Sequence, residues 1–114
     1  FGVDLPVYFC NNELIEKKIE NLNKEKLRCW RLPLYQPYLK KINSQVADLS
    51  NASLDGMAGS ITAALFLKEF LNKSDTPWLH FDTYAWSQGS ILGSNGAALQ
   101  GLEIMSEFLR KNFN

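Results

Sequence analysis

The spacing of apolar and polar positions varies along the chain. At its start, an extended pattern is followed by a helical one, which predicts a short extended segment and then a helix. Residues 3–9 form a short extended segment, which Pro6 restricts to a sheet edge, a strand end or a non-strand approach. A surface helix is expected from Asn11 or Asn12 to about residue 26, with Glu–Lys pairs on its polar side. One stripe of this helix is apolar and is expected to be buried: Leu14, Ile15, Ile19 and Leu22.

The middle of the chain lacks a regular period. Residues 29–34 are rich in apolar and aromatic side chains, but Pro33 and Pro37 break regular structure, so we expect a packed, irregular crossing. A turn of helix is expected over residues 38–42 and a short strand over residues 46–49. Residues 51–59, with glycine, serine and asparagine, predict a loop.

Two later segments are apolar on every side. Residues 60–71 predict a helix without a polar face, which must be covered from several directions. Its residues expected to be deeply buried are Ile61, Ala64, Leu65 and Phe66. Residues 77–86 predict a central strand, apolar on both faces, of the kind found in sheets covered by helices. A loop over residues 88–96 leads to a last helix from about 97 to 110, whose buried face is expected to hold Ala98, Leu102, Met105 and Leu109.

This order of elements predicts an α/β fold, part of a three-layer α/β/α domain with a central mixed sheet covered by helices. The strands are too few to cover the hydrophobic faces on offer, so the sheet is expected to be incomplete in this chain. We treat residues 1–114 as a single partial domain. The chain starts with Phe1 rather than Met and without signal-peptide features, so we expect a processed or partial sequence.

Composition narrows the classes of partner. A hydrophobic content of 46% supports a packed core and excludes a disordered chain. Twelve basic and twelve acidic residues cancel, so neither nucleic acid nor an anionic membrane is an expected partner. The longest apolar run, residues 61–67, is too short for a membrane span. Two cysteines are too few for a disulfide scaffold, so Cys10 and Cys29 are expected to be reduced thiols of a cytoplasmic protein.

Few side chains are candidates for chemistry, and each has a structural alternative. His80 and Asp82 lie two apart on a predicted strand and could share a metal or a proton, or could be structural groups at its end. Ser60 opens a helix but lacks the G-x-S-x-G context of a nucleophile, so we interpret it as an N-cap. Arg31 is expected to pair with a carboxylate. No complete catalytic or metal-binding set is present.

Four blocks of sequence, taken together, resemble a known family. They are residues 30–34 with Tyr38, residues 46–51, residues 59–67 and residues 77–82. The combination of W-R-L-P-L, S-I-T-A-A-x-F-L and W-x-H-x-D, in this order and spacing, is similar to the C-terminal part of the catalytic domain of the cytosol (leucyl) aminopeptidase family. The ending H-F-D-x-Y-A-W resembles the bacterial branch of that family.

The resemblance implies a metal-dependent hydrolase that releases N-terminal residues, often leucine, from peptides. It implies two divalent metal ions, manganese or zinc, and assembly as a cytoplasmic homo-hexamer. The family's metal-ligand motif, N-T-D-A-E-G-R, is absent here, so no catalytic or metal residue is carried over and the remainder of the catalytic domain is an expected partner. By position, the resemblance assigns the wall of the substrate side-chain pocket to Tyr84, Ala85 and Trp86.

Two other functions stay open at this point. The chain could be a non-catalytic α/β binding or assembly module that kept the fold without the site. It could also be a small subunit that completes an active site on another chain. An in-frame N-T-D-A-E-G-R sequence upstream of Phe1 would decide in favour of the enzyme.

Overall fold

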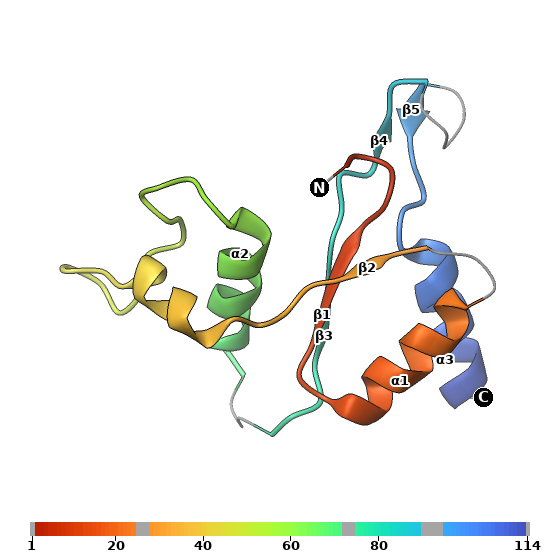
Figure 1. The fold of residues 1–114 in the computed structure, drawn as a ribbon, viewed down its shortest axis with the longest axis horizontal. Helices are drawn as coiled ribbons and strands as arrows, with labels where there is room; N and C mark the ends of the chain where they lie inside the picture. Colours follow the sequence, from red (N-terminus) through yellow and green to blue (C-terminus); the bar gives the residue numbers. More distant parts are fainter. Residues whose placement is uncertain (1, 25–27, 72–74, 90–94, 114) are drawn as a thin grey trace.

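The computed structural model of the chain describes residues 2–24, 28–71, 75–89 and 95–113. Along these residues, strands and helices alternate from one end of the chain to the other (Figure 1). Their order is β1 (Val7–Cys10), α1 (Glu13–Asn23), β2 (Trp30–Arg31), the 3-10 helix η1 (Gln36–Ile42), α2 (Gly59–Lys68), β3 (Leu79–Asp82), β4 (Trp86–Ser87), β5 (Gly96–Ala97) and α3 (Leu102–Phe113).

Strand β1 is the middle strand of a three-stranded mixed sheet, in the order β2-β1-β3. It pairs in parallel with β2 and antiparallel with β3. Val7, Tyr8 and Phe9 are all buried, as expected of a strand that is covered on both faces. The strand begins directly after Pro6, so the proline stands at a strand end, one of the three positions that the sequence left open.

The prediction of a central strand over residues 77–86 is wrong. Within the described residues, β3 is an edge strand of four residues, all half-buried. The chain then turns at Ala85, whose φ of 56° is left-handed, and Trp86 starts a separate two-stranded sheet formed by β4 and β5. The apolar run over residues 77–86 is therefore divided between two short strands, β3 and the start of β4, with a turn between them.

Helices cover both faces of the three-stranded sheet, so the predicted three layers and mixed sheet are confirmed. Figure 1 shows α1 and α3 on one side of the sheet and α2 on the other. Alternate residues of β1 point to opposite faces of the sheet and pack into two separate cores. Tyr8 joins the core with α1 and α3, to which Ile19 and Ile104 also belong. Val7 and Phe9 join the core with α2 at Ala64.

Helix α1 forms where its sequence signals place it. The side chain of Asn12 caps the helix by accepting a hydrogen bond of 3.0 Å from the N–H of Ile15. Ile19 and Leu22 are buried as expected. Leu14, however, is 64% exposed. Each residue advances about 100° around a helix, so Leu14 lies beyond the stripe of positions 15, 19 and 22.

Helix α2 starts differently from the prediction. The cap position is Ala58, in a left-handed conformation without a side-chain hydrogen bond, and Ser60 lies inside the first turn. The N-cap interpretation of Ser60 is therefore wrong. Ala64 and Leu65 are deeply buried as expected, whereas two other expected core residues are only half-buried: Ile61 and Phe66.

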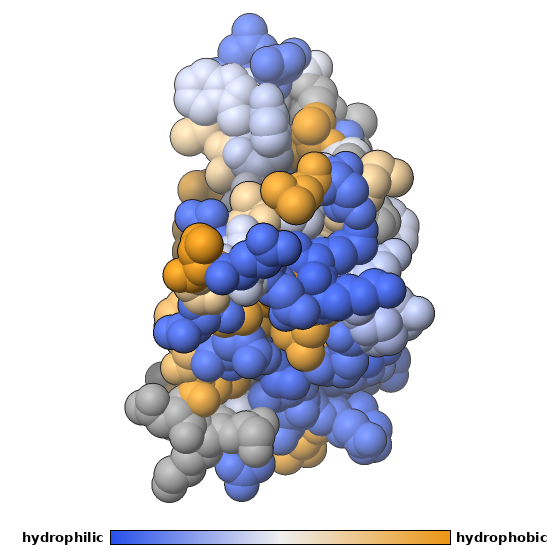
Figure 2. Space-filling view, turned by 90° about the vertical axis from the view of Figure 1, so that its left-hand side faces the viewer, coloured by the Kyte–Doolittle hydropathy of each residue, from blue (hydrophilic) through white to orange (hydrophobic). Residues whose placement is uncertain are grey.

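The side of the molecule that carries α2 and η1 mixes apolar and hydrophilic surface. Figure 2 shows separate apolar patches among hydrophilic side chains on this face. Leu67 of α2 is 43% exposed, and Phe70, just after the helix, is 64% exposed. A helix without a polar face thus keeps part of its apolar surface uncovered within this chain.

Of two further expectations in the middle of the chain, one fails for a local reason and one is met. Residues 46–49 form no strand, because the backbone N–H groups of Val46 and Ala47 donate to the Ser44 hydroxyl and fold the segment into bends. The 3-10 helix η1 contains the predicted turn at residues 38–42 and begins two residues earlier. None of the helices within the described ranges is long and apolar enough to cross a bilayer.

The last helix, α3, starts later than predicted and buries another face. Gly96 and Ala97 belong to β5, and Gly101, with a φ of 77°, turns the chain into the helix. Ile104 and Phe108 are buried. Among the residues expected on the buried face, Leu102 and Leu109 are exposed, while Met105 and Ala98 are half-buried.

Candidate functional site

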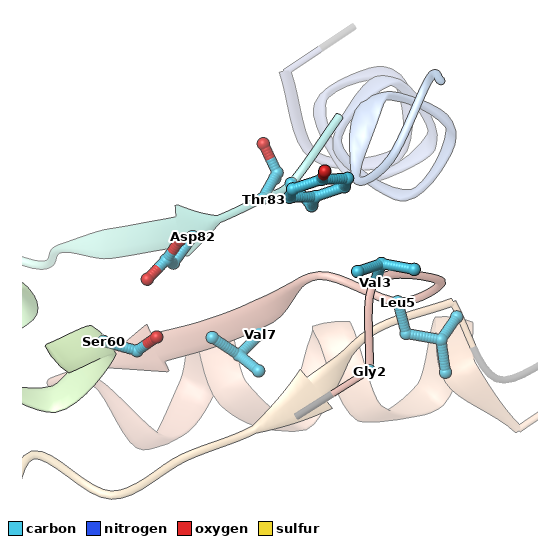
Figure 3. Close-up of a pocket in the computed structure, with 8 residues that line it drawn as sticks. Gly2, Val3, Leu5, Val7, Ser60, Asp82 and Thr83 are labelled. Atoms are coloured by element: carbon cyan, nitrogen blue, oxygen red, sulfur yellow. The ribbon is translucent and has the colours of Figure 1, made fainter. Parts of the chain in front are cut away.

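A cavity of about 220 Å³ opens where the N-terminal segment, β1, the first turn of α2 and the end of β3 meet (Figure 3). Its lining residues come from segments far apart in the sequence: Gly2, Val3, Leu5, Val7, Ser60, Asp82, Thr83 and Tyr84. The antiparallel register of β1 and β3 places Val7 opposite Asp82, and both residues line this cavity.

The cavity has an apolar and a polar side. Val3, Leu5 and Val7 form an aliphatic wall. Figure 3 shows the side chains of Ser60 and Asp82 turned toward the space between α2 and β3. A carboxylate beside a hydroxyl accepts hydrogen bonds from a cationic or amide donor, while the aliphatic wall accommodates an apolar side chain. This combination suits part of a peptide.

The structure places the three predicted pocket residues differently from one another. Tyr84 lines the cavity. Ala85 follows it in a left-handed turn and Trp86 enters β4, opposite Ala97, and neither belongs to the cavity lining. Sequence reasoning named no role in the pocket for Thr83, which directly precedes the predicted trio.

His80 and Asp82 lie on the same side of β3, as expected, but His80 is held in an aromatic stack. Its ring lies 5.6 Å from the ring of Trp78 and 6.0 Å from that of Phe9. Burial lowers the pKa of His80, and the Asp82 carboxylate opposes that shift. A neutral, stacked imidazole fits the structural alternative for this pair.

The remaining candidates have structural surroundings too. Both cysteines are free, and burial raises the pKa of the Cys10 and Cys29 thiols, which disfavours the nucleophilic thiolate. The expected ion pair of Arg31 is confirmed, because its Nη2 lies 2.9 Å from Oε2 of Glu16. This pair joins β2 to α1.

Among the residues that the structure describes, no group of three His, Cys, Asp or Glu side chains could hold a metal ion.

Comparison with known protein families matches residues 1–105 to the catalytic domain of the cytosol aminopeptidase family. The chain belongs to this family. The family match covers all the cavity-lining residues and most of the three layers, so the cavity belongs to an aminopeptidase-type fold.

Individual cytosol aminopeptidases agree with this assignment. The cytosol aminopeptidase of Buchnera aphidicola subsp. Acyrthosiphon pisum is 37% identical over 116 residues, which cover 99% of this chain and 22% of that protein. The crystal structure of the cytosol aminopeptidase from Coxiella burnetii matches 99% of this chain with a TM-score of 0.88 and 36% identity. A mutant of tomato leucine aminopeptidase matches 98% of it with a TM-score of 0.82 and 28% identity.

The chain is short beside these relatives. It spans 22% of the Buchnera protein and 25% of the Coxiella chain. These relatives are therefore about four times as long as this chain.

Proposed function

We propose that this chain is the C-terminal segment of the catalytic domain of a metal-dependent leucyl-type aminopeptidase, which releases N-terminal amino acids from peptides. Residues 1–114 form one partial domain that supplies the sheet, the core helix α2 and a wall of the substrate pocket. The observation that carries the proposal is the match of 99% of the chain to a solved cytosol aminopeptidase with a TM-score of 0.88.

The pocket wall is proposed to consist of the segment after β3, with Tyr84, Ala85 and Trp86. Tyr84 supports this role because it lines the cavity beside Asp82 and Thr83. Ala85 sets the turn that directs Tyr84, and Trp86 anchors the end of the segment in β4. The aliphatic side of the cavity suits an apolar substrate side chain such as leucine.

The family resemblance implies two divalent metal ions, manganese or zinc, that would polarise the scissile carbonyl and activate water. The described residues do not fit such a centre, because they contain no cluster of three suitable ligands. The ligands are therefore proposed to come from the remainder of the catalytic domain, which is also the chain's main partner. We further propose a cytoplasmic homo-hexamer with peptides as substrates and without nucleic-acid or membrane partners.

The proposal is tested by comparing this chain with the complete gene product. We expect the complete, homogeneous protein to hydrolyse leucine p-nitroanilide, to lose activity on chelation and to regain it with manganese or zinc. The chain alone should show no turnover and no retention of either metal. A complete protein that is inactive on a panel of aminoacyl amides with both metals would favour the non-catalytic assembly module.

The pocket wall has its own test. Tyr84→Ala in the complete gene product should change the preference among N-terminal residues. Tyr35→Ala is the matched control, because Tyr35 is similarly exposed, at 49% against 54% for Tyr84, and lies outside the cavity lining. Equal effects of the two substitutions would contradict the assignment.

A further inference from the structure

One side-chain amide ties together three segments around the cavity. Oε1 of Gln100 accepts hydrogen bonds from the backbone N–H groups of Tyr84, at 3.1 Å, and Ala85, at 3.0 Å. Its Nε2 donates to the carbonyl oxygen of Val3. Figure 1 shows these segments together at one end of the sheet: the N-terminal loop, the chain leaving β3 and the chain entering α3.

The turn that Gln100 holds is a conformation that needs support. Ala85 has a φ of 56°, a left-handed conformation that is unfavourable for a residue with a Cβ. Gln100 binds the N–H side of this turn, while the carbonyl oxygen of Ala85 accepts a hydrogen bond of 3.0 Å from the N–H of Ala98. Both contacts come from the segment between β5 and α3.

Gln100 stands outside the cavity lining, but its partners Val3 and Tyr84 are both part of it. They lie in different segments, and the amide of Gln100 bonds to the backbone of each. We infer that Gln100 is a positioning residue: it sets the spacing of the Val3 and Tyr84 walls and thereby the side-chain preference of the pocket. This inference rests on the proposed function.

The role requires an amide. The two backbone N–H groups need a hydrogen-bond acceptor, whereas the Val3 carbonyl needs a donor. The side-chain amide of Gln supplies both from one planar group. Glu keeps the acceptor and loses the donor at neutral pH, whereas Met has a similar length and offers at most a weak sulfur acceptor. Gln100→Glu and Gln100→Met therefore separate the two halves of the contact.

The variants are made in the complete gene product, with two controls. Gln45→Met makes the same substitution at an exposed position outside the cavity lining. Asn11→Leu removes an amide that secures the other end of β3, where Asn11 accepts from the N–H of Trp78 at 2.7 Å and donates to the carbonyl of Thr76 at 2.8 Å. General loosening of β3 would therefore appear in Asn11→Leu as well.

Selectivity is the first readout, taken as the ratio of kcat/KM for leucyl and alanyl p-nitroanilides. With several hydrogen bonds lost, we expect Gln100→Met to lower this ratio about tenfold, mainly through KM for the leucyl substrate. Gln100→Glu should show a smaller change, and it carries the test if Gln100→Met does not fold. Both controls should keep the wild-type ratio.

Hydrogen exchange of the backbone amides of Tyr84 and Ala85 is a second readout that needs no activity. Exchange should be faster in Gln100→Met and close to wild type in Gln45→Met and Asn11→Leu. Unchanged exchange in a folded Gln100→Met overturns the inference, as does unchanged selectivity or an equal loss of selectivity in Asn11→Leu. Faster exchange in a protein whose wild type has no aminopeptidase activity supports the backbone contact and overturns the proposed function instead.

Discussion

The imidazole of His80 lies almost parallel to the indole of Trp78, with ring centroids 5.6 Å apart and an angle of 11° between the planes. Phe9 approaches from the neighbouring strand at 6.0 Å, in the register that pairs Phe9 with His80. The only histidine of the chain is therefore part of the packing between the sheet and α2, and Asp82 is left to face the cavity.

This packing predicts a low pKa for His80. Burial disfavours the imidazolium, so the pKa should lie below the ordinary value of 6.5. The unfolded chain then binds the proton more readily than the folded one. Stability linked to His80 is thus present above about pH 6.5 and is lost as the pH falls below it.

The measurement is an NMR titration of labelled histidine in the complete gene product, with the His80 signal assigned by its loss in His80→Gln. Asp82→Asn should lower the pKa further, because the Asp82 carboxylate raises it. Asp48→Asn, at an exposed position of the bend region, should leave it unchanged. A wild-type pKa at or above 6.5 would show that the stack does not exclude water.

The two cysteines are predicted to be unpaired thiols with different reactivity. Thiol titration of the denatured, unreduced chain should find two thiols, in accord with two free cysteines. In the folded protein, Cys29 is 1% exposed and should react much more slowly than the half-buried Cys10. Cys10→Ser should remove the faster phase. A mass two units lower, with no titratable thiol, would instead indicate a disulfide.

Sequence reasoning succeeded where the signal is local. Asn11 or Asn12, followed by an apolar stripe of helical period, predicts α1, and the order of the elements predicts helices around a sheet. It failed where a choice depends on distant contacts. Helix α3 has two apolar sides, and only its packing on α1 decides that Ile104 and Phe108 are buried while Leu102 and Leu109 are exposed.

The candidate site shows the same limit. Family position named Tyr84, which lines the cavity, and its role in a substrate pocket stays a prediction. Asp82 and Ser60 line one cavity because of the β1–β3 register and the packing of α2. Neither of these can be predicted from a local sequence pattern. Gln100 was missed because nothing near it in sequence indicates its bonds to Val3 and Tyr84.

Gly101 is predicted to be needed for its backbone conformation. Its φ is 77°, and an added Cβ would lie 3.5 Å from Phe81, an ordinary contact. The cost of Gly101→Ala is therefore conformational, about 1 kcal/mol or more. Gly59→Ala is the control, because Gly59 opens α2 at an ordinary φ with open space around it. The urea midpoint of the complete gene product should fall for Gly101→Ala and stay at the wild-type value for Gly59→Ala. A Gly101→Ala midpoint equal to that of the wild type would contradict a strained backbone at Gly101.

The last prediction concerns the apolar surface that this chain leaves uncovered. The exposed large apolar side chains on or beside its helices include Phe70 at 64%, Leu102 at 55%, Leu109 at 48% and Phe113 at 74%. Full burial of such a side chain contributes about 1.5–3 kcal/mol, so leaving several exposed removes an amount comparable with a typical domain stability of about 5–15 kcal/mol. The relatives contain about four times as much chain, since this chain covers 25% of the Coxiella structure, and that extra protein is available to cover these positions.

We therefore expect the chain alone to bind the dye ANS strongly and to unfold without a sharp transition, and the complete gene product to do neither. Leu102→Gln with Leu109→Gln should reduce dye binding by the chain while weakening the complete protein, because the same surface is buried there. Glu103→Gln with Arg110→Gln changes neighbouring residues and leaves the apolar area intact. This control should change neither the dye binding of the chain nor the stability of the complete protein. A cooperative, monomeric melt of the chain without dye binding would mean that these side chains are surface residues of a self-sufficient domain.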